Sequence, residues 1–456
     1  MTPAPNVLEL IGNTPIVKVN RLDTGPCTLY LKLESTNPGG SIKDRIGISM
    51  VEAAEREGKL KPGGTMIEAT AGNTGLALAL VAGQKGYRLI LVIPDKMSQE
   101  KMFHLKAMGA EVVVTRSDVQ KGHPEYYQDI AARIAKETGA FFVNQFENPN
   151  NPIAHEQTTA PEIWEQMEHK VDAIVCGVGS GGTLTGLGRY FAKVSPKTEM
   201  ILADPKGSIL APLVNEGLTV KAGSWLVEGI GEDFIPKVCD IELTHKAYAI
   251  TDAESIEMSR QVLKMEGIFC GSSSGTLIAA ALKYCQEQTE PKRVLTFVAD
   301  SGNKYLSKIY NEYWLEDYGF VEKKQTHDLR DLITRPISDK SAVVVSPSDS
   351  LQAAYRKMKN HDISQLPVME DGKLMGILSE TDILLHVAGS PTGFGIPACE
   401  AMTKKLVTIQ STRAVDDLVP IFEQGLTAIV MDKDEFLGLI TPIDFLQYLR
   451  KRAGIS

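Results

Sequence analysis

Cysteine is scarce and unpatterned in this sequence of 456 residues. The six cysteines lie far apart, without a CxxC pair or a neighbouring histidine cluster, and the eight histidines show no ligand spacing. This distribution argues against both a disulfide framework and a zinc site. We expect reduced core cysteines and no structural metal.

Long apolar runs and an excess of positive charge are also missing. No stretch of 18 or more apolar residues occurs, and no basic segment followed by an apolar run stands at the N-terminus, so neither a membrane span nor a signal peptide is predicted. The formal net charge of −9, without a long Lys/Arg run, argues against nucleic acid or an anionic membrane as the main partner. We expect a cytoplasmic protein that acts on small molecules.

The composition is that of a soluble globular protein, 43% hydrophobic and 23% charged, in a chain long enough for two or three domains. From about residue 6 to 320, β-rich apolar runs alternate with helical patterns. The runs are "RLILVIP" from Arg88, "AEVVVT" from Ala110, "AIVCGVG" from Ala173, "MILAD" from Met200 and "VLTFVAD" from Val294. This alternation predicts an α/β fold with a largely parallel sheet.

An internal repeat follows the polar passage "EKKQTHD" at 322–328. Without gaps, 367–384 aligns with 429–446, and each copy has the pattern of a strand, a tight turn, a strand and a helix opened by Ser/Thr-x-x-Asp. The predicted organisation is one domain over 1–322, a linker over 323–334, and repeat domains over 335–392 and 393–456.

The Ser/Thr-x-x-Asp segments have two interpretations. Ser379 with Asp382, and Thr441 with Asp444, can cap their helices or contact a ligand. The tandem resembles a pair of CBS domains over about 330–456, an α+β module whose Gly-h-h-Ser/Thr-x-x-Asp segment, with h apolar, often binds the ribose and phosphate of adenosyl ligands. The resemblance implies a candidate site for S-adenosylmethionine or an adenine nucleotide at these four residues.

Lys43 lies where helix electrostatics disfavour a cation. The stretch "STNPGGSIKDRIGISMVEAAEREG", from Ser35, predicts a loop followed by a helix, with Ser41 able to cap it and Lys43 in its first turn. The positive end of the helix dipole favours a neutral amine there, and a neutral amine is a better nucleophile. The alternative is a solvated surface lysine.

Two glycine-rich stretches suit anion binding. "EATAGNTGLALAL", 68–80, predicts a strand that turns into a helix and presents backbone N–H groups together with Thr70, Asn73 and Thr74; "CGVGSGGTLTGLGRYF", 176–191, is a candidate phosphate cradle. The second stretch also satisfies G-x-G-x-x-G, with Asp204 at the end of a later predicted strand, which is the pattern of an NAD-dependent oxidoreductase. An NAD site, however, needs neither Lys43 nor the "TAGNTG" loop.

Together, an activated amine, an asparagine loop and a phosphate loop are the parts that pyridoxal 5'-phosphate requires. "NPGGSIKDR", "TAGNTG", "GVGSGGT" and "CGSSSG" resemble the fold-type II pyridoxal phosphate enzymes of β-replacement, the cysteine synthase and cystathionine β-synthase group, over about 6–320. The resemblance implies a tryptophan synthase β-like region of two parallel-sheet subdomains.

The resemblance also implies roles for single residues. Lys43 would hold the cofactor as a Schiff base and act as the catalytic base. Asn73 would bind the phenolic oxygen of the cofactor, and Ser273 would meet its ring nitrogen unless it only caps its helix. The phosphate would be bound by Gly179, Ser180, Gly181, Gly182 and Thr183. The substrate would be bound by Thr70, Ala71, Gly72, Asn73, Thr74, Gln145, Gly229 and Glu232.

The implied reaction condenses L-serine with L-homocysteine to L-cystathionine, with release of hydrogen sulfide from cysteine as a side activity. The alternatives are a cysteine synthase that uses O-acetylserine and sulfide, and a nucleotide sensor with a vestigial enzyme. The early start of the catalytic region predicts no haem. Ala71 stands where serine is usual, and Glu232 where eukaryotic members carry tyrosine; we expect Glu232 at the entrance, against the amino group of homocysteine. A homodimer, extended to a tetramer by the repeats, is expected by resemblance.

Overall fold

The computed structural model describes residues 3–70, 72–95, 97, 99–116, 118–119, 122–321, 326–338, 341–390 and 392–453. The chain forms two compact units, Met1–Leu315 and Glu316–Ser456. Each unit has its own buried apolar core. None of the described helices is long and apolar enough to cross a membrane.

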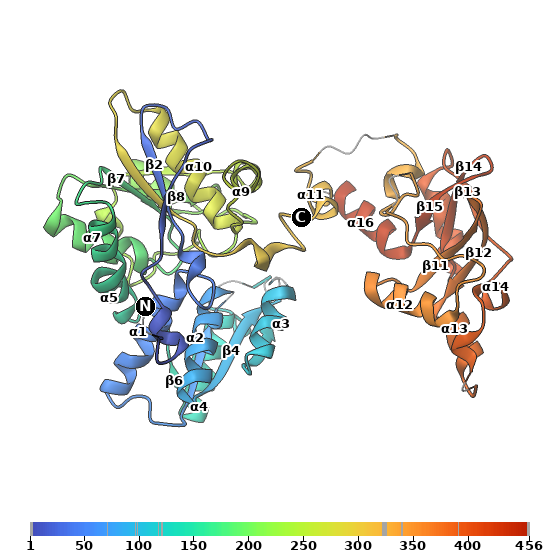
Figure 1. Cartoon of the computed structure of the whole chain (residues 1–456), viewed down its shortest axis with the longest axis horizontal. Coiled ribbons are helices and arrows are strands. Elements are labelled where there is room, and N and C mark those ends of the chain that lie inside the picture. The colour runs from blue at the N-terminus through green and yellow to red at the C-terminus, as the bar shows by residue number, and fades with distance from the viewer. Residues whose placement is uncertain are drawn as a thin grey trace. The chain divides into compact units, whose positions relative to one another are not determined.

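The first unit contains two sheets (Figure 1). The larger sheet has the order β1-β2-β10-β7-β8-β9, in which only β1 runs antiparallel to its neighbour. Its strands are β1 (Ile16–Lys18), β2 (Thr28–Lys32), β7 (Ala173–Cys176), β8 (Glu199–Pro205), β9 (Lys246–Ile250) and β10 (Arg293–Phe297). The smaller sheet is parallel throughout, in the order β5-β4-β3-β6. Its strands are β3 (Thr65–Ala69), β4 (Arg88–Pro94), β5 (Glu111–Thr115) and β6 (Phe141–Phe142). The predicted α/β fold is confirmed.

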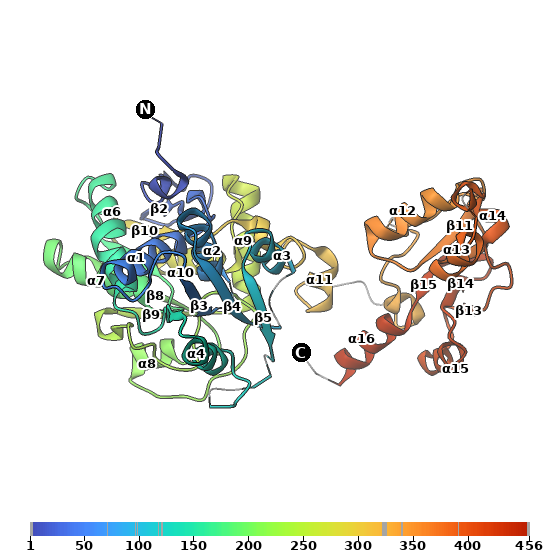
Figure 2. The same ribbon diagram turned by 90° about the horizontal axis from the view of Figure 1, so that it is seen from below.

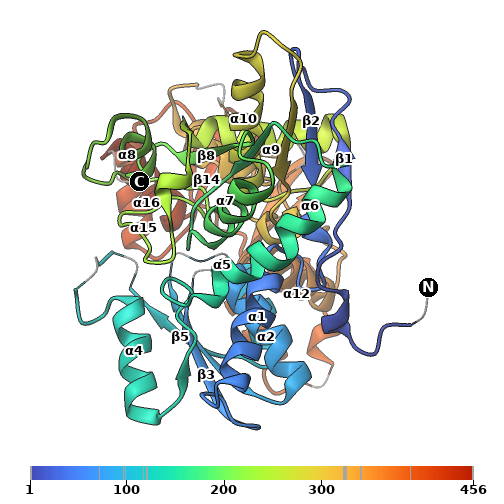
Figure 3. The same cartoon turned by 90° about the vertical axis from the view of Figure 1, so that its left-hand side faces the viewer.

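Helices cover these sheets. They are α1 (Lys43–Arg56), α2 (Asn73–Lys85), α3 (Gln99–Ala107), α4 (Tyr127–Thr138), α5 (Asn150–Ala154), α6 (Ala160–Gln166), α7 (Gly182–Val194), α8 (Leu210–Glu216), α9 (Asp252–Glu266), α10 (Ser272–Gln286) and α11 (Glu312–Asp317). The smaller sheet lies between α4 on one face and α2 on the other (Figure 2). Helices α1 and α2 lie side by side (Figure 3), and a Cβ on Gly47 would be 2.9 Å from the Cβ of Ala77. That contact requires glycine and brings the starts of both helices together.

Parallel strands place several loops at one edge of each sheet. Strand β3 leads into α2, β7 leads into α7, and β10 leads into the segment that begins at Val298. Because the carboxyl ends of neighbouring parallel strands share an edge, loops far apart in the sequence converge there, where α/β proteins bind ligands.

The second unit repeats one hairpin and helix. Its two copies are β11 (Gln365–Glu370), β12 (Lys373–Ser379) and α13 (Glu380–Val387), and β14 (Ala428–Asp432), β15 (Glu435–Ile440) and α16 (Pro442–Arg452). Both hairpins shift register at the same aligned step, Val368/Met369 and Val430/Met431, so the predicted ungapped repeat is confirmed. The other elements are α12 (Leu351–His361), α14 (Ala398–Ala401), β13 (Thr408–Gln410) and α15 (Val419–Glu423).

Candidate active site

Lys43 is the first residue of α1, as predicted. The helix is not capped by Ser41: the N-cap residue is Ile42, and the Ser41 hydroxyl accepts the N–H of Lys43 itself at 3.2 Å. Burial lowers the pKa of the Lys43 amine, and the Asp300 carboxylate opposes that shift. Within the described ranges the Lys43 amine has no hydrogen-bond or ion-pair partner. It is a partly buried amine without a structural contact, so the surface-lysine alternative is wrong.

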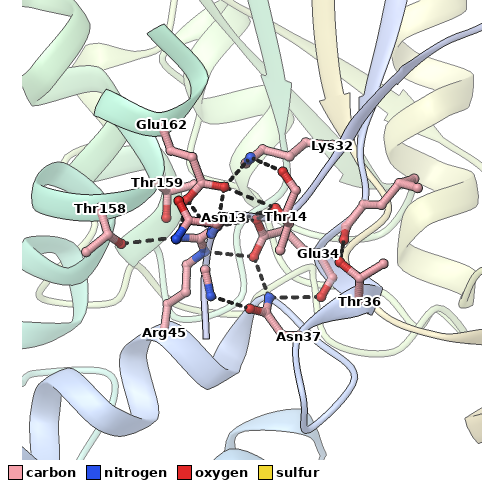
Figure 4. Close-up of polar contacts among 12 residues, drawn as sticks. Asn13, Thr14, Lys32, Glu34, Thr36, Asn37, Arg45, Thr158, Thr159 and Glu162 are labelled. Carbon is pink, nitrogen blue, oxygen red and sulfur yellow. Dashed lines mark hydrogen bonds and ion pairs between the residues drawn. The ribbon is translucent and has the colours of Figure 1, made fainter. Parts of the chain in front are cut away.

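A cluster of charged side chains anchors the first turn of α1 (Figure 4). Arg45 donates to Glu34 at 2.8 and 2.9 Å and to Glu162 at 3.0 Å, and Glu162 also accepts from Lys32 at 2.7 Å. Burial alone would raise the pKa of Glu34, but Arg45 and then Lys32 outweigh it and keep that pKa below its usual value. The cluster ties α1 to β2 and α6, so the position of Lys43 is determined by three elements.

The loop between β7 and α7 forms an anion cradle. Gly181 has φ +86°, a Cβ on Gly179 would lie 2.5 Å from the carbonyl oxygen of Gly229, and a Cβ on Gly182 would collide with the Asn151 side chain. The N–H groups of Gly179, Ser180 and Gly181 donate to no acceptor among the described residues. Backbone N–H groups that have no acceptor and lie at a helix N-terminus suit a phosphate group. The glycines allow this arrangement because their neighbours leave no room for a side chain.

Two polar residues that the sequence analysis missed support this loop, one from α5 and one from the π-helix His155–Thr159 that follows it. Asn151 donates to the Ser180 hydroxyl at 2.9 Å, and the His155 ring lies 3.2 Å from the Thr183 hydroxyl. Burial, followed by the nearby Arg45 and Lys43, lowers the pKa of His155 well below its usual value, so the ring is neutral. The Asn-rich passage before them was the available signal, but no spacing rule connects it to the loop.

The predicted carboxylate-binding residues also come together. The Thr74 hydroxyl donates to the Gln145 side chain at 2.7 Å, and the Thr70 hydroxyl accepts the N–H of Gly72 at 3.3 Å. All four residues therefore line the turn between β3 and α2. Ala71 lies outside the described residues.

Gly229 and Glu232 lie in the loop that packs on the phosphate loop. Gly229 meets it through the close approach to Gly179. Glu232 is partly buried and its N–H donates to Ser208 at 3.1 Å. The pKa of Tyr127, at the start of α4, is raised to about 12 by burial and then by the charge of Glu232.

Asn73 is the first residue of α2, and both the nitrogen and the oxygen of its side-chain amide contact residues that the sequence analysis did not identify. It donates to Asp300 at 2.7 Å and accepts from Lys304 at 2.8 Å. Both residues follow β10, in "VADSGNKY". A carboxylate just after a buried strand was the signal that could have identified Asp300.

Ser273 lies in the first turn of α10 but does not cap it. The N-cap residue is Gly271, without a side-chain cap, so the helix-cap interpretation of Ser273 is wrong. Ser272 accepts the N–H of Glu228 at 3.2 Å and Ser274 accepts the N–H of Ala299 at 3.0 Å, whereas the hydroxyl of Ser273 has no partner in the described part of the chain. It is the one hydroxyl of the three that is free to meet a ligand.

Asp204, the acidic residue of the NAD alternative, has a structural role. Its carboxylate is fully buried and accepts the N–H of Ala211 at 2.8 Å. A carboxylate that is buried and hydrogen-bonded in this way is not available to bind the ribose of a dinucleotide.

In the second unit, the cap interpretation is confirmed for the first copy, where Ser379 and Asp382 form a reciprocal capping box. In the second copy, Asp444 accepts from the hydroxyl and the N–H of Thr441, which is one half of the same arrangement. The second carboxylate oxygen of Asp382 accepts weakly from Thr403, at 3.4 Å, and that of Asp444 accepts from Thr334. These bonds neither require nor exclude a ligand.

Comparisons with known proteins agree with this arrangement. A family model described as pyridoxal-phosphate dependent enzyme matches 7–300, and the CBS domain model matches 329–389 and 398–451. The cystathionine beta-synthase of Apis mellifera is 36% identical over 98% of this chain and 91% of its own length. A cysteine synthase of Staphylococcus aureus is 43% identical over 67% of this chain and 96% of its own length.

A solved structure gives the same picture for the first unit. A hydrogen sulfide-producing enzyme from Fusobacterium nucleatum, 37% identical, superposes with a TM-score of 0.63 and covers 67% of this chain and 100% of that one. The similarity to the cystathionine beta-synthase of Apis mellifera continues through both CBS domains. The chain belongs to the pyridoxal-phosphate-dependent enzymes and, with its CBS-domain pair, to the cystathionine β-synthase family.

Proposed function

We propose that this chain is a pyridoxal phosphate-dependent cystathionine β-synthase that condenses L-serine with L-homocysteine to L-cystathionine and water. The observation that carries the proposal is the similarity to a cystathionine beta-synthase over 98% of the chain, CBS pair included. It is supported by Lys43 at the start of α1, which has no hydrogen-bond or ion-pair partner among the described residues, and by the turns that lead from β7 into α7 and from β3 into α2.

The residues fit the cofactor. The backbone N–H groups of the glycine cradle would hold the phosphate. Lys43 would bind the aldehyde carbon, Asn73 would contact the phenolic oxygen, and Ser273 would contact the ring nitrogen. When bound, pyridoxal phosphate withdraws electrons from the amino acid joined to it, so that the Cα proton can be removed and the Cβ substituent can leave. A neutral serine at the ring nitrogen, unlike an aspartate, leaves the ring unprotonated, which suits elimination at Cβ better than transamination.

The side chains of this protein then bind the substrate and move protons. Thr70, Thr74 and Gln145 bind the serine carboxylate, which fixes the Cα–H bond against Lys43. The Lys43 amine takes the Cα proton, and the hydroxyl of serine leaves Cβ as water. Over the whole reaction, the extra proton of that water is balanced by the proton that the homocysteine thiol gives up when it becomes the thiolate. The thiolate of homocysteine forms the new C–S bond at Cβ, and Lys43 returns the proton to Cα. Burial favours the neutral amine that the first of these steps requires.

Cysteine synthesis is the second candidate, because the first unit alone aligns at 43% identity with a cysteine synthase. Product analysis by mass spectrometry separates the two. The purified protein receives serine plus homocysteine in one reaction and O-acetylserine plus sulfide in another. Faster formation of cystathionine supports the proposal, and faster formation of cysteine replaces it. Cysteine plus homocysteine, in a third reaction, measures the proposed release of hydrogen sulfide.

We further propose that Ser379, Asp382, Thr441 and Asp444 contribute to a site for an adenosyl ligand, and that the chain forms a homodimer through its catalytic region. Calorimetric titration with S-adenosylmethionine, AMP and ATP tests the first point. Sedimentation velocity tests the second, since a monomeric active protein would contradict it.

A further inference from the structure

The Asn73 amide is held between a cation and an anion. Its carbonyl oxygen accepts from the Lys304 ammonium at 2.8 Å, and its nitrogen donates to the Asp300 carboxylate at 2.7 Å. An ammonium only donates and a carboxylate only accepts. A flipped amide would place its N–H groups against the ammonium and its oxygen against the carboxylate, so these two charges determine the orientation of Asn73.

Lys304 also holds the turn before Lys43. It is only 7% exposed, and its two remaining N–H groups donate to the carbonyl oxygens of Gly39 and Gly40, both at 3.1 Å. Gly40 has φ +75°, a conformation that suits glycine. The three donors of one ammonium thus join the start of α2 to the loop that leads into α1.

Asp300 is supported on its other side. It is fully buried, and the oxygen that accepts from Asn73 also accepts from the Tyr305 hydroxyl at 2.7 Å. Its second oxygen is buried without a partner among the described residues. Asp300 is therefore held firmly by Tyr305, while the Asn73 nitrogen, which carries two hydrogens, donates only one of them to it.

We propose that Lys304 and Asp300 are positioning residues for the cofactor: they orient the Asn73 amide so that its second N–H points to the phenolic oxygen of pyridoxal phosphate. This inference rests on the proposed role of Asn73. It assigns a role to two residues that do not themselves touch the substrate.

The experiment measures the dissociation constants of two ligands for the full-length protein freed of cofactor. One ligand is pyridoxal phosphate and the other is its 3-deoxy analogue, which lacks the phenolic oxygen. Lys304→Met is expected to raise the dissociation constant of pyridoxal phosphate about tenfold, which is the usual effect of losing one hydrogen bond to a charged group. The dissociation constant of the analogue should rise less than threefold. Equal losses for both ligands, or no loss for either, would overturn the proposal.

Two further variants separate the possible causes. Asn73→Ala should lose the discrimination between the two ligands; if it does not, the role of Asn73 itself is wrong. If Asn73→Ala loses the discrimination between the two ligands and Lys304→Met retains it, the positioning role of Lys304 and Asp300 is wrong and the role of Asn73 stands. Lys304→Met added to Asn73→Ala should leave the ratio of the two constants unchanged.

Lys308→Met is the matched control, because Lys308 belongs to the same segment but pairs with Glu228 at 2.6 Å. Both of its dissociation constants should stay within twofold of the parent. Should Lys304→Met not fold, Lys304→Gln removes the charge with less loss of polarity and is judged by the same ratio.

Discussion

At the scale of single residues, Lys43 combines two effects that favour a neutral amine. Its place in the first turn of a helix opposes a positive charge, which the sequence alone indicates. The structure adds burial, which lowers the pKa of the amine, whereas the Asp300 carboxylate opposes that shift. That carboxylate accepts from Asn73 and Tyr305, and the Lys43 amine has no hydrogen-bond or ion-pair partner among the described residues, so it keeps the freedom that a nucleophile and base needs.

Lys43→Ala is expected to lower cystathionine formation by at least ~10³-fold, because amine and base are lost together. The visible absorbance of the lysine-bound cofactor should disappear, while the melting temperature of the cofactor-free protein should change little. Lys59→Ala is the control, since that side chain is 63% exposed. Retained turnover in Lys43→Ala would contradict the assignment.

Glu232→Gln tests the entrance hypothesis. If the carboxylate pairs with the homocysteine amino group, the apparent KM for homocysteine should rise about three- to tenfold, as expected when one charged contact is lost, with the KM for serine unchanged. Steady-state kinetics with each substrate varied gives both values. Glu216→Gln, an exposed residue at the end of α8, is the control. An unchanged homocysteine KM would reject the idea.

At the scale of elements, the site depends on how closely α7 and α1 approach their neighbours. The phosphate loop lies against Asn151, Cys239 and Gly229 at its glycines. Helix α1 is fastened at its start by the charge cluster of Arg45, Glu34, Glu162 and Lys32 (Figure 4). Neither contact touches the substrate, yet each one determines where a binding or catalytic group lies.

Gly182→Ala should weaken cofactor binding by at least tenfold, because the new methyl group collides with Asn151 and displaces the loop. Gly83→Ala is the matched control: that helical glycine has open space around it, so alanine should be neutral or stabilise the helix by about 0.5–1 kcal/mol. Cofactor titration and thermal melting give both results. Unchanged affinity in Gly182→Ala would show that the loop adapts.

Arg45→Met should reduce the free energy of unfolding of the first unit by about 3–5 kcal/mol, because it leaves the fully buried Glu34 without its partner. Arg116→Met, which removes an exposed arginine, should change it by less than about 0.5 kcal/mol. Urea unfolding followed by tryptophan fluorescence reports on this unit, since Trp164, Trp225 and Trp314 all lie within it. Equal effects of both variants would mean that the cluster is not a stabilising element.

At the scale of the whole molecule, catalysis and the repeated module belong to separate units. Every predicted cofactor and substrate residue lies in Met1–Leu315, and the four residues of the proposed nucleotide site lie in Glu316–Ser456. The module repeats its hairpins down to their register shifts. This division predicts that chemistry and nucleotide response can be separated.

A chain that ends at Val321 should therefore form cystathionine within about threefold of the full-length rate and should lose any response to adenosyl ligands. Activity with and without S-adenosylmethionine measures both. The full-length variant Asp382→Ala, Asp444→Ala is the control, because it alters the module without removing it. A folded but inactive truncated chain would show that the first unit needs the second.

The sequence by itself determined the alternation of strands and helices, the ungapped repeat, and the lysine, asparagine and phosphate loops. These features depend on periodicity and on residues close together in the chain, such as Lys43 two positions after Ser41. Local patterns misplaced the caps predicted at Ser41 and Ser273, since the N-cap residues are Ile42 and Gly271, whereas the cap predicted at Ser379 is present.

Only the tertiary structure decided which residues support those loops. Lys304 reaches Asn73 across 231 positions, and Arg45 reaches Glu162 across 117. The contact of Arg45 with Glu162 joins α1 to α6. That of Lys304 follows from sheet order: β10 lies between β2 and β7, so the segment after β10 ends beside loops that come much earlier in the chain. No periodicity encodes that order, because it arises from the packing of whole sheets and helices.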